Sequence, residues 1–182
     1  MLKILKVFSA LASVISYLCL SACQTGVSVA PMEEDMLSKK IYLVRHAEKT
    51  KQRNDPALTP DGQLRAKALI KVLGDAGVTH IHSSDYTRTR ETARPLADYL
   101  GLDIDIYDPR ELSAMADTLK LTDGTHLVVG HSNTTPQLVE LLGGEGGTPI
   151  IEATEYDRLY VVKISEAGEV SSQLIRYGAG QD

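Results

Sequence analysis

The chain has 182 residues, of which 43% are hydrophobic, enough for one domain of ordinary size with a real core. Its formal net charge of −5 argues against nucleic acid or an anionic lipid surface as the main partner. Any site for an anionic group must therefore be a local positive pocket on an acidic protein.

Residues 1–22 have the features of a bacterial lipoprotein signal peptide. Lys3 and Lys6 precede an apolar stretch, residues 7–20, that is too short to span a bilayer comfortably. The following Leu-Ser-Ala-Cys resembles a lipobox, so we expect cleavage before Cys23 and diacylation of that cysteine. The alternative is an ordinary signal peptide that is cut at another small residue.

Cleavage before Cys23 would leave 17 basic and 24 acidic residues. Residues 23–38 are polar and lack periodicity, which predicts a flexible tether, and we expect residues 39–182 to form the folded domain. The residue after the cysteine is Gln24, and an Asp there would have indicated inner-membrane retention. We therefore expect an exported lipoprotein on the periplasmic face of the outer membrane.

Short apolar runs alternate with helical patterns from Lys39 onward. The expected strands are 41–44, 79–82, 102–107, 126–129, 158–164 and 170–177, and the expected helices are 60–75, 85–100, 113–121 and 136–142. Thr59-Pro60 has the form of a helix cap followed by proline at the first helical position. We expect the first helix to bury Leu64, Ala68, Val72 and Leu73, and Pro95 to break or kink the second.

This alternation predicts a three-layer α/β/α fold, with a mainly parallel sheet, helices on both faces and a C-terminal β-hairpin. The Gly-rich, acidic stretch 143–157 is expected to be a surface loop, in preference to a lid.

Reactive side chains follow four of the expected strands, at the edge of the sheet where ligands collect in parallel α/β folds. These segments are Arg45-His46-Ala47-Glu48, Ser83-Ser84-Asp85-Tyr86-Thr87-Arg88, Asp108-Pro109-Arg110-Glu111 and Gly130-His131-Ser132. Each is weak evidence alone, and their convergence on one edge predicts a site.

The motifs together resemble the histidine phosphatase superfamily, the phosphoglycerate mutase-like group. The resemblance runs from Ile41 to about Ile164 and rests on four motifs in the family's order, which are Arg45-His46-Ala47-Glu48; Leu58-Thr59 with Gly62 and Arg65-Ala66; Ser83-Ser84 with Arg88 and Thr92-Ala93; and Gly130-His131-Ser132.

The resemblance implies a role for each matched residue. His46 matches the nucleophile that forms a phosphohistidine, and Arg45 and Arg88 match two arginines that clamp the phosphate. His131 matches a second pocket histidine that donates to a phosphoryl oxygen, and Arg90 is a weaker alternative to Arg88. Two nearby arginines disfavour protonation of His46, which must be neutral to attack phosphorus.

The leaving alkoxide needs a proton, and Glu111 resembles the acid that many family members carry after this strand. Glu48, Asp85 and Asp108 are competing candidates, and some short members lack such an acid. Ser132 and Asn133 are candidates for substrate contact.

The remaining histidines, His80, His82 and His126, are expected to be structural. No histidine pairs with carboxylates or thiolates at metal-ligand spacing, so we expect neither metal nor cofactor. The sequence thus predicts a metal-independent phosphatase, with a phosphorylated small molecule or phosphoprotein as substrate. Two alternatives are a mutase-type phosphotransferase, disfavoured by the short mature chain and by export, and a silent envelope lipoprotein that binds phosphorylated ligands.

Overall fold

A computed structural model describes residues 39–178, and the predicted signal peptide, tether and lipidated Cys23 lie outside them. The described elements are β1 (Lys39–Arg45), α2 (Pro60–Leu73), β2 (His80–Ser84), α3 (Thr87–Leu100), β3 (Ile104–Tyr107), α4 (Leu112–Leu121), β4 (Thr125–Gly130), α5 (Thr134–Leu141), β5 (Arg158–Ile164) and β6 (Val170–Arg176). None of these helices is long and apolar enough to cross a membrane.

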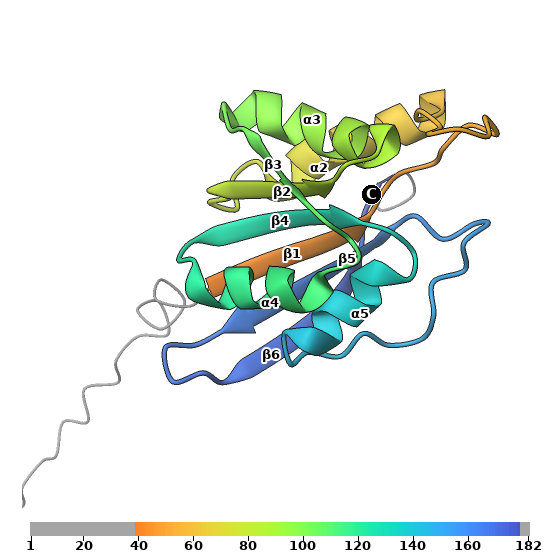
Figure 1. Cartoon of the computed structure of the whole chain (residues 1–182). Coiled ribbons are helices and arrows are strands. Elements are labelled where there is room, and N and C mark those ends of the chain that lie inside the picture. Colours follow the sequence, from red (N-terminus) through yellow and green to blue (C-terminus); the bar gives the residue numbers. More distant parts are fainter. Residues whose placement is uncertain (1–38, 179–182) are drawn as a thin grey trace, which may run out of the picture. The chain divides into compact units, whose positions relative to one another are not determined.

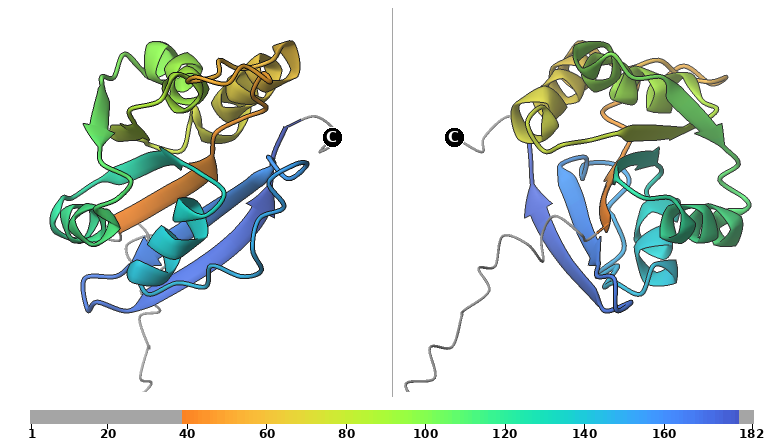
Figure 2. Two further views of the ribbon diagram at one scale, coloured as in Figure 1. Left: turned by 45° about the vertical axis from the view of Figure 1, so that its right-hand side comes forward. Right: turned by 90° about the vertical axis from the view of Figure 1, so that its left-hand side faces the viewer.

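The six strands form one mixed sheet in the order β3-β2-β4-β1-β5-β6. The first four strands in that order are parallel, while β5 runs antiparallel to β1 and forms a hairpin with β6. Helices α2 and α3 cover one face of the sheet and α4 and α5 cover the other (Figures 1 and 2). The predicted three-layer α/β/α fold is confirmed.

Two hydrophobic clusters lie on the two faces because successive strand residues point in opposite directions. In β1, Leu43 packs in the cluster beneath α4 and α5, and the adjacent Val44 packs in the cluster beneath α2 and α3. Strand β4 repeats the alternation with Val128 and Val129. Burial on both faces explains why these strands appear in the sequence as nearly continuous apolar runs.

The N-terminus of α2 forms as the sequence predicts, but the buried face of the helix differs. Thr59 caps the helix by accepting a hydrogen bond from the Gly62 backbone N–H. Leu64 and Val72 are 65% and 38% exposed, so the prediction is wrong for these two residues, while Leu73 is buried as predicted and Ala68 packs against the core. The buried residues are Gly62, Ala66, Leu69 and Leu73.

Of the two outcomes expected at Pro95, the break does not occur, because helix α3 continues through Pro95 to Leu100. The stretch 143–157 is largely exposed, as expected, and in addition it contacts Arg45 of the candidate site through Glu152, Glu155 and Tyr156. Figure 1 shows this segment running along the edge of the sheet between α5 and β5.

Candidate active site

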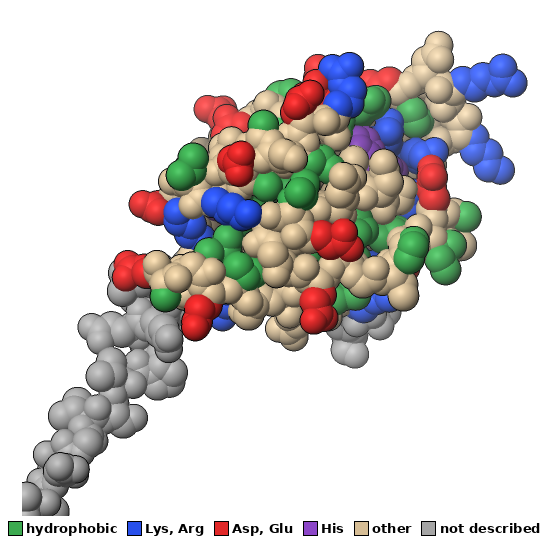
Figure 3. All heavy atoms as spheres, turned by 60° about the horizontal axis from the view of Figure 1, so that its bottom comes forward, with side chains coloured by type: hydrophobic (Ala, Val, Ile, Leu, Met, Phe, Trp, Pro, Cys, Tyr) green, Lys and Arg blue, Asp and Glu red, His purple; other side chains and the backbone are tan. Residues whose placement is uncertain are grey.

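A cavity of about 320 Å³ lies beyond the carboxyl ends of the parallel strands. Its lining residues come from the segments after β1, β2, β3 and β4 and from the loop before β5: His46, Lys49, Tyr86, Arg88, Pro109, Arg110, His131, Ser132, Asn133, Thr134 and Glu152. In Figure 3, histidine side chains are visible at the surface on this side of the protein, next to Lys and Arg side chains. We call this the histidine cavity.

His46 follows β1, and its backbone N–H donates to the carbonyl of Gly130 at 2.9 Å, which joins the ends of β1 and β4. Its ring Nδ1 lies 2.8 Å from the carbonyl oxygen of Ala47. A carbonyl can only accept, so Nδ1 carries the proton and the lone pair is on Nε2. The side chain is 3% exposed.

Burial lowers the pKa of His46 to about 3, and the positive charges of Arg45 and Arg88 act in the same direction. We expected the arginines to keep this ring neutral, but removal from water is the larger cause. The imidazole is therefore neutral near pH 7 and has one free lone pair.

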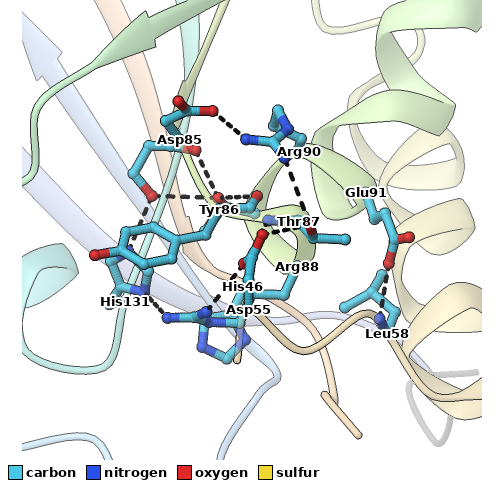
Figure 4. Close-up of polar contacts among 12 residues, drawn as sticks. His46, Asp55, Leu58, Asp85, Tyr86, Thr87, Arg88, Arg90, Glu91 and His131 are labelled. Carbon is cyan, nitrogen blue, oxygen red and sulfur yellow. Dashed lines mark hydrogen bonds and ion pairs between the residues drawn. The ribbon is translucent and has the colours of Figure 1, made fainter. Parts of the chain in front are cut away.

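His131 lies beside His46, with the ring centroids 5.6 Å apart. Its Nδ1 is 3.3 Å from a guanidinium nitrogen of Arg88, and its Nε2 is 2.9 Å from the hydroxyl oxygen of Ser84 (Figure 4). Guanidinium groups only donate, so Nδ1 accepts and Nε2–H donates to Ser84. The Ser84 hydroxyl in turn donates to Thr89, and this chain of hydrogen bonds fixes the orientation of the His131 ring.

Burial lowers the pKa of His131 to about 4, with smaller contributions from Arg88 and Arg45. The neutral ring thus directs its proton at Ser84. The predicted donation to a phosphoryl oxygen stays a prediction and requires a second proton, on Nδ1.

The guanidinium of Arg45 is held by the loop before β5 and does not line the histidine cavity. It donates to the carbonyl oxygens of Glu155 at 3.0 Å and Glu152 at 2.8 Å, and Tyr156 packs on it with the ring centroid 4.1 Å from Cζ. Burial lowers the pKa of Arg45, and the negative charge of Glu152 opposes that shift. We call this arrangement the carbonyl clamp.

Arg88 approaches the cavity from the first turn of α3. Its Cζ lies 4.5 Å from the ring centroid of Tyr86, and its guanidinium is 3.8 Å from the Asp55 carboxylate. The Nε atoms of Arg88 and Arg45 are both buried without a hydrogen-bond partner. A buried donor without an acceptor costs about 1–3 kcal/mol, so the unpaired Nε of Arg88, a residue of the cavity wall, favours an anionic ligand.

The structure brings together most of the residues that the sequence singled out. His46, Arg88, His131, Ser132 and Asn133 line the histidine cavity. Arg45 is a neighbour of this group. Arg90, by contrast, pairs with Asp85 at the start of α3.

Glu111 is not one of the residues that line the cavity, because it precedes α4 as an exposed N-cap residue. The carboxylate residue in the lining is Glu152, which sequence reasoning missed together with Lys49 and Tyr156. A signal was available for Tyr156, an aromatic residue in an otherwise acidic and Gly-rich loop. The contacts of Glu152 and Glu155 with Arg45 use main-chain carbonyls and have no signature in the sequence.

A second histidine cluster lies at the opposite ends of the strands. His80, His82 and His126 stack on one another, and His82 Nε2 is 3.1 Å from His126 Nδ1. Within residues 39–178, no group of three or more His, Cys, Asp or Glu side chains is placed to hold a metal ion. These histidines make hydrogen bonds and pack within the fold.

Residues 41–113 match the family model of the histidine phosphatase superfamily, branch 1. Over these residues, which run from β1 to the start of α4, the chain is similar to this superfamily. A probable phosphoglycerate mutase from Enterobacter sp. (strain 638) is 40% identical over 78 residues, which make up 39% of this chain and 36% of that protein. The chain thus spans little more than a third of the length of this curated relative.

Solved structures share the fold of this chain over most of its length. The protein histidine phosphatase SixA, complexed with tungstate, has a TM-score of 0.59 and 18% identity, covering 76% of this chain and 96% of that one. A mycobacterial glucosyl-3-phosphoglycerate phosphatase has a TM-score of 0.60 and 14% identity, covering 79% and 100%. At these identities the likeness concerns the fold.

Proposed function

We propose that the protein is a metal-independent phosphatase that hydrolyses phosphomonoesters or phosphoproteins through a phosphohistidine on His46. The observation that carries this proposal is the state of the His46 ring, which is buried and neutral, with its proton directed at the Ala47 carbonyl. These features leave Nε2 as a nucleophile at the wall of a cavity flanked by guanidinium groups.

In the proposed reaction, the Nε2 lone pair attacks phosphorus and the ester P–O bond breaks. The leaving oxygen takes a proton from an acid, and water then attacks the phosphohistidine to release phosphate and restore neutral His46. The arginines stabilise the negative charge that spreads over the phosphoryl oxygens. A bound phosphate dianion also favours protonation of His131, which would then donate from Nδ1.

Replacement of His46 tests the proposal. We expect His46→Ala to reduce phosphate release from an aryl phosphate at least about 1000-fold, because both ring nitrogens of His131, the other histidine of the cavity, are engaged. His80→Ala is a matched control, since that histidine lies outside the cavity, and it should retain activity. Acid-labile labelling of the wild-type chain, absent in His46→Ala, would identify the intermediate, and undiminished turnover in His46→Ala would remove His46 from the mechanism.

A phosphotransferase is the second candidate, because curated relatives are named probable phosphoglycerate mutases. It differs from a phosphatase in the acceptor of the phosphohistidine, which is a substrate hydroxyl in place of water. Transfer of labelled phosphate to an added alcohol in preference to water would favour it, and stoichiometric binding of a phosphate ester without either reaction would favour a silent binding protein.

We also propose, from the sequence alone, that the chain is exported and anchored to the outer membrane through Cys23. A free thiol at a new N-terminus is otherwise unexplained, and two acyl chains hold a protein at a bilayer stably. Labelled palmitate should enter the wild-type chain and not Cys23→Ser. Equal labelling of both proteins would contradict lipidation at this residue.

A further inference from the structure

A second hollow of about 470 Å³ adjoins the histidine cavity. It is lined by Asp85, Tyr86, Ile106, Tyr107, Asp108, Pro109 and Arg110. Tyr86, Pro109 and Arg110 line both hollows, so a molecule whose phosphate lies against His46 can extend past them into the second one. We call the second hollow the side pocket.

The side pocket has an apolar wall that nothing in the described chain covers. Ile106 in β3 is 52% exposed and Tyr86 is 40% exposed. Apolar groups that are exposed together in a concave surface are typical of ligand sites, and this volume lies within the range of pockets that hold small molecules.

The Tyr86 ring is fixed between the two hollows. It meets the His131 ring edge-on, with centroids 5.0 Å apart and an interplanar angle of 88°, while the Arg88 guanidinium packs against it (Figure 4). A ring that is held in place offers an apolar surface without an entropic cost of ordering it when a ligand binds.

The charges at the rim of the side pocket are neutralised within the protein. Arg110 makes a bidentate pair with Asp108, with its Nη2 2.6 Å from Oδ2, and Asp85 is paired with Arg90. Both cations at this rim are thus paired with carboxylates, which leaves neither of them for a second phosphate. The side pocket therefore suits an uncharged, apolar part of a substrate.

We propose that the side pocket binds the leaving group of the substrate and selects a flat aromatic group that packs between Tyr86 and Ile106. This inference rests on the proposed phosphatase function, since it assumes that the phosphate occupies the histidine cavity. It defines the substrate class as aryl phosphate monoesters, with larger aromatic groups preferred over smaller ones.

The test compares phenyl and 2-naphthyl compounds, which differ in ring size more than in leaving-group chemistry. Binding of the non-hydrolysable phenylphosphonate and 2-naphthylphosphonate is measured by calorimetry, and hydrolysis of the two phosphates by initial rates. We expect the wild-type chain to bind the naphthyl compound about tenfold more tightly, the scale on which a hydrophobic pocket distinguishes ligands of different size. The KM values should follow the same ratio.

Three variants locate the effect. Ile106→Ser should reduce the naphthyl preference to about twofold with little change for phenyl, and Ile106→Val should keep the preference. Leu121→Ser is the matched control, because Leu121 is 83% exposed on α4 and lines neither hollow. A wild-type ratio near one, or a ratio unchanged in Ile106→Ser, would overturn the assignment.

The two proposals fail in different ways. Tighter binding of the naphthyl phosphonate without hydrolysis of either phosphate would leave the side pocket standing and refute the phosphatase. Hydrolysis of both phosphates with equal KM and equal affinity for both phosphonates would retain the phosphatase and refute the side pocket.

Discussion

The two site histidines differ in which ring nitrogen has a protein partner. His46 uses only Nδ1, while both nitrogens of His131 are engaged, by Ser84 and Arg88. A nucleophile needs a free lone pair, and a ring that supports a charged oxygen needs a fixed position. The hydrogen bonds are thus consistent with the roles proposed for these two residues, His46 as nucleophile and His131 as a support for the phosphoryl oxygen.

The acid that protonates the leaving group is testable by two paired substitutions. Glu152 lines the histidine cavity and Glu111 does not, so we expect Glu152→Gln to lower kcat/KM on an alkyl phosphate by about 100-fold. Glu111→Gln should change it by less than about threefold. An alkoxide depends on a proton far more than a nitrophenolate does, so p-nitrophenyl phosphate should be hydrolysed almost normally by both variants.

The reverse result would support Glu111, which the sequence indicated, as the acid that protonates the leaving group. A loss confined to Glu111→Gln on the alkyl substrate would mean that this carboxylate reaches the leaving group when substrate is bound. Equal losses on both substrates in Glu152→Gln would point instead to the negative charge of Glu152 beside the Arg45 guanidinium, which the substitution removes.

At the scale of elements, α2 shows what the sequence predicts well and what it misses. Its start was readable from Thr59-Pro60, because capping is local chemistry. Its buried face was not, since that face includes Gly62 and Ala66, which a search for large apolar residues passes over. A Cβ at Gly62 would lie 2.2 Å from the Glu48 carbonyl oxygen, so close packing selects small residues there.

Two leucines on α2 allow a matched test of this buried face. Leu69 is fully buried, and truncation to alanine should lower the free energy of unfolding by about 2–5 kcal/mol through lost burial and a cavity. Leu64 is 65% exposed, and Leu64→Ala should change it by less than about 0.5 kcal/mol. Urea unfolding of both variants measures the difference, and equal losses would contradict the observed orientation of α2.

The contact of the loop before β5 with the candidate site could not be predicted from its sequence. Its Gly and acidic residues are typical of solvent-facing surface, yet Arg158 binds the Glu155 carboxylate with Nε at 2.8 Å and the Thr148 carbonyl oxygen at 2.6 Å. These contacts link the loop to the start of β5 and hold Tyr156 beside Arg45. The spacing of Glu155 and Arg158 in the sequence does not indicate that these residues pair beside the candidate site.

At the scale of the whole molecule, the sheet order explains why the motifs could be combined from sequence. Strands β2, β4 and β1 are parallel neighbours, so the segments that follow them must meet at one edge. That inference needs only strand direction. The position of Glu111 depends on how the chain turns between β3 and α4, which strand direction does not determine.

Acid should destabilise this protein through its buried histidines. Burial lowers the pKa values of His46 to about 3 and of His82 and His131 to about 4, so the unfolded chain binds protons between about pH 6.5 and 4 that the folded chain excludes. The free energy of unfolding should therefore fall as pH falls through this window, by at least about 3 kcal/mol in total.

Urea unfolding at pH 7, 5.5 and 4.5 measures this dependence. His82→Asn, in a histidine outside the candidate site, should reduce the slope of the free energy of unfolding against pH. The pKa of Glu155 is lowered to about 2 by its hydrogen bond with Arg158, which adds a further loss only below about pH 4.5. A free energy of unfolding that stays constant from pH 7 to 4.5 would contradict the burial of neutral imidazoles.

The carbonyl clamp has a consequence for how this site can change. Arg45 is held by main-chain oxygens at positions 152 and 155, and main-chain oxygens are present whatever amino acid occupies those positions. The side chain at position 152 can thus be exchanged while the grip on the arginine is kept. Substitution at position 152 therefore removes a carboxylate from the wall of the histidine cavity and leaves the main-chain contact with Arg45 in place, so the two contributions of this residue can be separated.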